Sequence, residues 1–297
     1  MKPSPRLSPI LLAASALALP GVAVAQGSSS SQAQAKAPAS SPVQSTVRTQ
    51  AKPELKRWGV VLGATFDTSL HTFDDPAKRA KMLITTSPTY QWSELYKSKL
   101  NLVTQQDLRG DQDTTVYKAS VSLSRAPIAL NPFVSFQSAV SVGLPLSASR
   151  RDRESYLTGV SLIPRVTLDP SGGRGGKLQA YWEGSVARLF HRYDTQTNGA
   201  SNNRYSASNE IGAGYDLGKG LSLSASYLYS MMWTYKGNQR AKFSFDGSLD
   251  WQVSEPMSVG LGYSNGGDPL KDNGIDSNIA VFDAENSSVS AGVTFVF

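Results

Sequence analysis

Eight charged residues between positions 99 and 250 are the side chains whose type and spacing could do chemistry in this chain. Basic residues come first and acidic residues follow, with one exception; the set is Lys99, Lys118, Arg165, Glu183, Glu210, Lys242, Asp246 and Asp250. On opposite sides of a narrow water-filled lumen, these charges would create a transverse electric field that orients polar or zwitterionic solutes and slows apolar ones. They could equally form ion pairs with one another that only neutralise the charges and stabilise the wall around the lumen. Both interpretations stay open.

Strands must position these residues, because apolar and polar side chains alternate from Trp58 to Phe297. The clearest segment covers residues 221–235, where Leu, Ala, Tyr, Met and Trp take the odd positions and Ser or Thr takes most of the even ones. A period of two is typical of a β-strand with one apolar face. The sequence predicts twelve such strands, the last of them at residues 289–297.

The links between the predicted strands fall into two length classes. Links after even-numbered strands are short, as at 218–220, and most links after odd-numbered strands are long, as at 265–286. This parity predicts an all-β fold, a transmembrane antiparallel up-and-down barrel of about twelve strands with both termini at the end of the short turns. The inward positions carry mostly Ser, Gly and Thr, which favours a narrow water-filled pore over a packed plug.

Three residues fit this barrel poorly and predict local irregularities. Pro88 and Pro164 each remove one hydrogen bond from a strand ladder, so a bulge or a shifted register is expected beside them. Asn209 falls at a position that would face lipid in the middle of a strand.

The terminal strand carries the one specific motif. Gly292, Phe295 and Phe297 stand on a segment whose odd positions are apolar up to the last residue. The ending resembles the C-terminal signal of Gram-negative outer-membrane β-barrel proteins, which has a terminal aromatic, a second aromatic two residues earlier and a glycine five residues before the end. The resemblance implies a porin-like outer-membrane location, contact with outer-membrane lipid and lipopolysaccharide, and insertion by the barrel-assembly machinery.

The start of the chain predicts export. Lys2 and Arg6 precede an apolar run, and Ala23 and Ala25 form a small-residue cleavage site, so residues 1–25 are a predicted signal peptide. Residues 26–56 are rich in Ser, Ala, Gln and Pro and predict a disordered periplasmic tail. Residues 57–297 form the predicted barrel. The chain has no Cys, which excludes disulfides. Its net charge of +6 falls to +4 without Lys2 and Arg6 of the predicted signal peptide, which is mild and does not indicate a nucleic-acid partner.

A catalytic alternative rests on Ser264. Some outer-membrane barrels are lipases or lipid A-modifying hydrolases, and the residues from Tyr263 to Gly267 resemble part of the lipase motif, although the expected preceding His is absent. The chain has two histidines, His71 and His191; either could approach Ser264 in space, but nothing in the spacing requires it. A turn is the more frequent reason for Ser-Asn-Gly. A structural or adhesive barrel without pore activity is a further alternative.

We therefore predict an outer-membrane channel for passive diffusion of small hydrophilic solutes. Its path is expected to run between a basic and an acidic wall formed by the eight charged residues. No cofactor, metal or catalytic residue is implied.

Overall fold

The computed structural model describes residues 57–72, 74–109, 113–171, 177–271, 275–283 and 285–297. The predicted signal peptide, 1–25, and tail, 26–56, lie outside these residues. No helix within the described ranges is both long and apolar enough to cross a bilayer. The strands are β1 (Trp58–Ser69), β2 (Ala80–Gln91), β3 (Tyr96–Asp107), β4 (Thr114–Arg125), β5 (Ile128–Asn131), β6 (Val134–Gly143), β7 (Tyr156–Leu168), β8 (Leu178–His191), β9 (Asn203–Gly218), β10 (Leu221–Thr234), β11 (Gln239–Gln252), β12 (Met257–Gly267) and β13 (Ser287–Val296).

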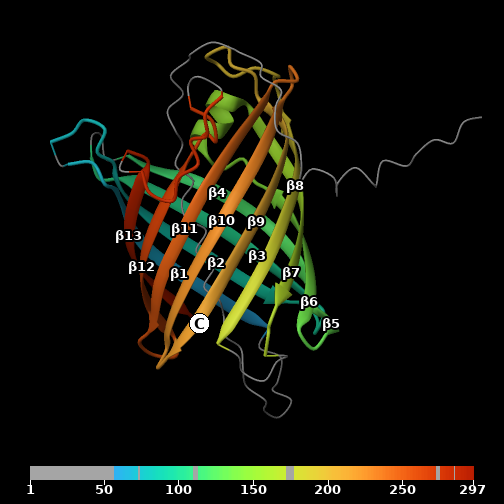
Figure 1. The fold of residues 1–297 in the computed structure, drawn as a ribbon. Helices are drawn as coiled ribbons and strands as arrows, with labels where there is room; N and C mark the ends of the chain where they lie inside the picture. Colours follow the sequence, from blue (N-terminus) through green and yellow to red (C-terminus); the bar gives the residue numbers. More distant parts are fainter. Residues whose placement is uncertain (1–56, 73, 110–112, 172–176, 272–274, 284) are drawn as a thin grey trace, which may run out of the picture.

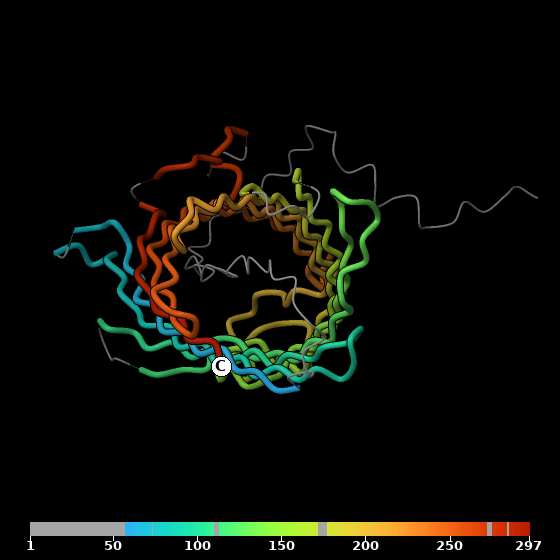
Figure 2. The backbone as a smooth tube through the Cα atoms, turned by 90° about the horizontal axis from the view of Figure 1, so that it is seen from below, coloured from blue at the N-terminus to red at the C-terminus, as the bar shows by residue number. Residues whose placement is uncertain are grey.

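Twelve of these strands close into one antiparallel barrel (Figures 1 and 2). Strands that are neighbours in sequence pair with each other, except that β4 pairs with β6 and not with β5, and β1 pairs with β13. The seam between β1 and β13 extends to the last residue, since Phe297 and Val60 exchange two backbone hydrogen bonds of 2.9 and 3.1 Å. The predicted twelve-stranded barrel is confirmed.

The additional strand β5 was not predicted; it lies in the link after β4, which the sequence predicts as a short turn at residues 125–131. β4 pairs with only the second half of β6, over residues 120–124, which leaves the first half of β6 without a partner on that side. Ile128 and Ala129 pair there with Phe136 and Ser135. β5 therefore satisfies backbone groups that would otherwise form an open sheet edge.

The barrel has two different ends. We call the end that holds Trp58 and Phe297 the turn end, and the opposite end the loop end. At the turn end, β9 and β10 are joined by only Lys219 and Gly220, whose φ angles of +55° and +80° suit a two-residue hairpin turn. At the loop end, longer links join β1 to β2, β6 to β7, β8 to β9 and β12 to β13. The link between β6 and β7 contains a short helical segment, η2 (Ser149–Arg153).

Alternation along the strands sorts side chains between the outer surface and the lumen. Large apolar side chains such as Leu62, Val186 and Leu261 stand exposed on the outer surface, while Asp67 and Leu83 are buried on the inner row. An apolar exterior around a more polar interior is the arrangement expected of a barrel that spans a bilayer. Aromatic rings gather at the turn end, where Tyr90 packs against Trp58 and Trp92 with ring centroids 4.6 and 4.7 Å apart.

The two strand prolines do not shift the register, contrary to the expectation from the sequence. The pairs on both sides of Pro88 along β2 and β3 keep one alignment, as do those on both sides of Pro164 along β7 and β8. Each proline interrupts the pairing with one neighbouring strand only. The pairing with the other neighbouring strand, β1 for Pro88 and β6 for Pro164, continues in register. Asn209 keeps its predicted outward position, paired with Gly184 and Tyr229, and is exposed.

A glycine makes room for a ring inside the barrel. Tyr181 on β8 lies across Gly212 on β9 so closely that a Cβ at Gly212 would fall 2.6 Å from the ring. The strands can keep this spacing only if position 212 has no side chain.

Gly212→Ala is expected to lower the free energy of unfolding by about 1–3 kcal/mol, since it overpacks the ring. Gly247→Ala is the matched control, because a Cβ there would meet only a carbonyl oxygen at 3.8 Å. Urea unfolding in lipid vesicles, followed by tryptophan fluorescence, measures both. In a Tyr181→Ala background the effect of Gly212→Ala should vanish; an undiminished effect would show that the ring is not its cause.

Candidate functional site: the lumen and its mouth

The register places the eight charged residues on one row, the row that also holds the buried Asp67. Lys99 pairs with Thr89 and Ser122, Glu183 pairs with Arg165 and Glu210, and Asp250 pairs with Ser222 and Gly260. Lys118 shares the row through its pairing with Val103, next to a bulge in β3–β4. Lys242 and Asp246 pair with Ser230 and Ser226.

The order of strands around the wall separates part of this set. β3 and β4, which carry Lys99 and Lys118, lie across the ring from β10 and β11, the latter carrying Asp246 and Asp250 (Figure 2). Arg165 on β7 and Glu183 on β8 lie instead on adjacent strands between these two sides. The side of β11 is itself mixed, because Lys242 stands on the same strand as the two aspartates.

Arg165 and Glu183 belong to a connected group on the wall. Arg165 Nη1 lies 3.4 Å from Glu183 Oε2, and its guanidinium stacks 4.1 Å above the centroid of the Tyr181 ring. The Tyr181 hydroxyl donates a 2.6 Å hydrogen bond to Glu210. Of the two interpretations that the sequence left open, Arg165 and Glu183 therefore fit the one in which charged residues pair with each other in the wall. Sequence reasoning missed Tyr181, although it has the same strand parity as Glu183.

A second polar network crosses the β1–β13 seam. Lys81 Nζ lies 3.5 Å from Asp67 Oδ1, and these side chains are only 12% and 8% exposed. Ser288 donates a 3.0 Å hydrogen bond to the same carboxylate. This pair was also missed; Lys81 stands at the edge of a predicted long link, where its role was not visible.

Ser264 continues this network and has no histidine beside it. Its Oγ lies 2.8 Å from Ser288 Oγ, on the inner row of β12. His71 instead lies 3.1 Å from Asp75, whose pKa is lowered by a hydrogen bond from the backbone N–H of Ala77. His191 packs edge-on against Tyr156. Within the described residues, the structure thus does not bring Ser264 and a histidine together.

The inner surface is less uniformly polar than the sequence suggested. Leu83 and Leu228 are buried on the inner row. The two aspartates of β11 accept hydrogen bonds from serines on the same strand: Ser244 donates to Asp246 at 3.1 Å, and Ser248 donates to Asp250 at 2.6 Å.

Two links meet over the opening at the loop end. The β8–β9 link, residues 192–202, bends across the opening (Figures 1 and 2). Asn202, almost fully buried, donates to the carbonyls of Glu154 and Tyr193 at 2.7 and 2.8 Å, and the Thr197 N–H donates to Arg153 at 3.0 Å. These bonds tie the link to η2 and narrow the mouth.

Two of the three arginines of η2 are paired with acidic residues in the same link. Arg150 lies 3.6 Å from Glu154 and stacks 4.0 Å from the Tyr156 ring. Arg151 donates a 2.9 Å hydrogen bond to Asp152, and this bond raises the pKa of the Arg151 guanidinium above its usual value.

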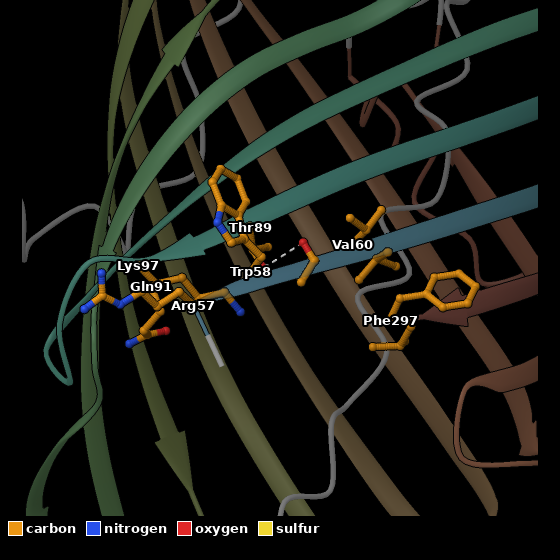
Figure 3. A pocket seen from close by; sticks show the side chains of 10 residues that line it. Arg57, Trp58, Val60, Thr89, Gln91, Lys97 and Phe297 are labelled. Atoms are coloured by element: carbon orange, nitrogen blue, oxygen red, sulfur yellow. Dashed lines mark hydrogen bonds between the residues drawn. The ribbon is translucent and has the colours of Figure 1, made fainter. Parts of the chain in front are cut away.

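A small cavity lies at the turn end beside the seam (Figure 3). Its volume is about 190 Å³, and its lining includes Arg57, Gln91, Lys97, Thr89 and Phe297. Arg57 and Lys97 give this end of the barrel a basic rim.

No family model and no curated protein sequence matches this chain. Among solved structures, an outer membrane channel from Pseudomonas putida F1 is similar over 84% of this chain and 100% of its own, with a TM-score of 0.55 and 13% sequence identity. A NanC porin structure is similar over 80% of this chain and 98% of its own, with a TM-score of 0.50 and 9% identity. At such identities the likeness is one of fold.

Lys81→Met should destabilise the barrel by about 3 kcal/mol, because it leaves the Asp67 carboxylate buried without its cation. Arg165→Met is the control: its pair is about 30% exposed, and its loss should stay below about 1 kcal/mol. Urea unfolding in vesicles compares the two. Adding Asp67→Asn to Lys81→Met should restore most of the loss, and equal effects of the two single variants would contradict the assignment.

Proposed function

We propose that this protein is an outer-membrane channel for passive diffusion of small hydrophilic solutes. Residues 1–25 direct its export, residues 26–56 form a periplasmic tail, and the loop end faces the outside of the cell. The barrel-assembly machinery inserts it, and outer-membrane lipid surrounds it. No cofactor is part of this function.

The observation that carries the proposal is a closed twelve-stranded wall with a largely polar inner row and an apolar outer surface. Twelve strands lie between the eight of a self-filled barrel and the 16 to 18 of a wide porin, which favours a narrow aqueous path. The shared fold with a bacterial outer membrane channel and a porin supports the same function.

The eight charged residues tune the path in this proposal. Lys99 and Lys118 face Asp246 and Asp250 across the lumen, so a passing solute meets opposite charges on its two sides. Such a field favours solutes that carry a dipole or both charges and disfavours apolar ones. Arg165, Glu183 and Glu210 line the wall between them, and Lys242 moderates the acidic side.

Lipid hydrolysis has less support. Such chemistry needs a histidine within hydrogen-bond reach of the serine, and Ser264 instead lies beside Ser288. The channel therefore remains the better account of the inner surface.

Purified protein in a planar bilayer should give discrete conductance steps. Lys99→Glu combined with Lys118→Glu should shift the reversal potential in a salt gradient toward cation selectivity, because it removes the basic side. Arg151→Glu is the control, since this residue lies in a loop and should shift the potential little. A bilayer that stays sealed with folded protein would contradict the channel, and unchanged selectivity would contradict the role of the two lysines.

A further inference from the structure

Two arginines with shared aromatic neighbours stand at the loop end: Arg188 on the outward row of β8, and Arg204 at an irregularity in the β9–β10 register. Arg188 on β8 occupies the outward row between Val186 and Phe190, which are 63% and 40% exposed. It pairs with Tyr205 on β9, an outward residue, and Arg204 precedes that tyrosine and is exposed. Charged side chains on such a row would face lipid or its headgroups rather than the lumen.

Both guanidinium groups share the same aromatic rings. Arg188 Cζ lies 4.4 Å and Arg204 Cζ 5.2 Å from the centroid of the Tyr205 ring. Tyr235 flanks both groups at 5.8 and 5.9 Å, and Phe190 lies 5.5 Å from Arg188. The rings lie within cation–π range of both groups, so two positive charges gather at one aromatic cluster.

Neither arginine has an acidic partner among the described residues. No carboxylate lies within ion-pair distance of either group in these ranges, and Arg188 Nη1 is buried without a hydrogen-bond acceptor. Two arginines of η2 differ, because Arg150 and Arg151 are paired with Glu154 and Asp152. Two neighbouring cations repel one another, and a buried donor without an acceptor is unfavourable, so an anion that is not among the described residues would stabilise this pair.

We propose that Arg188 and Arg204, framed by Tyr205 and Tyr235, form a binding site for a phosphate group of an outer-leaflet glycolipid. Aromatic girdles mark the level of the headgroups, and a guanidinium fork matches two phosphate oxygens. The acyl chains of the lipid would then run along the apolar surface that continues through Val186 and Val160. This inference rests on the proposed outer-membrane location, with the loop end outward.

The test measures binding of bisphosphorylated lipid A to detergent-solubilised protein by native mass spectrometry. The double variant Arg188→Gln/Arg204→Gln should weaken binding at least tenfold, because each charge-assisted pair with phosphate is lost. The matched control is Arg151→Gln/Arg192→Gln, which removes the same charge from the same end and should change binding less than about twofold. Lipid A with the same acyl chains but no phosphates should bind the unaltered protein as weakly as the double variant binds the phosphorylated lipid.

Several results would overturn the site. Equal losses in the two double variants would reveal unspecific attraction, and unaltered binding in Arg188→Gln/Arg204→Gln would remove these residues from it. Inorganic phosphate that competes at the same concentration as the lipid would indicate a free-anion site. If the glutamine variant does not show the heat-dependent gel shift of a folded barrel, Arg188→Lys/Arg204→Lys replaces it; the variant keeps charge but loses the fork, and binding should still fall.

Conductance of the same variants separates this inference from the proposed function. Arg188→Gln/Arg204→Gln should conduct as the unaltered protein does, since Arg188 lies on the outward row and Arg204 is exposed at the start of β9, away from the charged inner row. Loss of lipid binding with normal conductance supports the site, whereas normal binding in a protein that never conducts would contradict the channel and leave the site standing.

Discussion

Closure of the backbone hydrogen-bond ladder is the constraint on which the rest of this structure depends. Hydrocarbon offers no partner for a peptide N–H or C=O, so a sheet that crosses a bilayer can have no open edge. The chain meets this requirement at two places, where β1 pairs with β13 up to Phe297 and where β6 is covered jointly by β4 and β5. Once the wall is closed, strict alternation gives each residue one of two environments.

The alternation explains how much of the fold was predictable from the sequence. A period of two over twelve segments, with links of alternating length, predicted the barrel and its strand order. It also predicted that Asn209 lies on the outer surface. β5 was not predictable, because its pairing depends on where β4 leaves β6, which is a property of the closed barrel. The prolines misled the prediction for a similar reason: Pro88 and Pro164 each have a second neighbouring strand that holds the register.

The candidate site was predictable only as a row of residues. Parity placed Lys99, Arg165 and Asp246 together, but side-chain partners depend on neighbours that come from other parts of the chain. Arg165 pairs with Glu183 and stacks on Tyr181, and Asp67 pairs with Lys81; neither group has a local signature. The folding of residues 192–202 over the mouth likewise depends on Asn202 reaching the link that holds η2. The two faces of the wall nonetheless follow one rule, since charges on the inner row pair with each other, while Arg188 on the outer row lies against aromatic rings and has no acidic partner among the described residues.

The central claim is that alternate residues face lipid and water, and cysteine scanning tests it most directly because the chain has no native Cys. Single cysteines at successive positions along β10, from Leu223 to Met231, would be probed in vesicles. The account predicts that a membrane-impermeant thiol reagent labels the even positions, while a fluorophore at the odd positions is quenched by lipid-borne bromine. Equal labelling of both rows, or quenching without alternation, would contradict it.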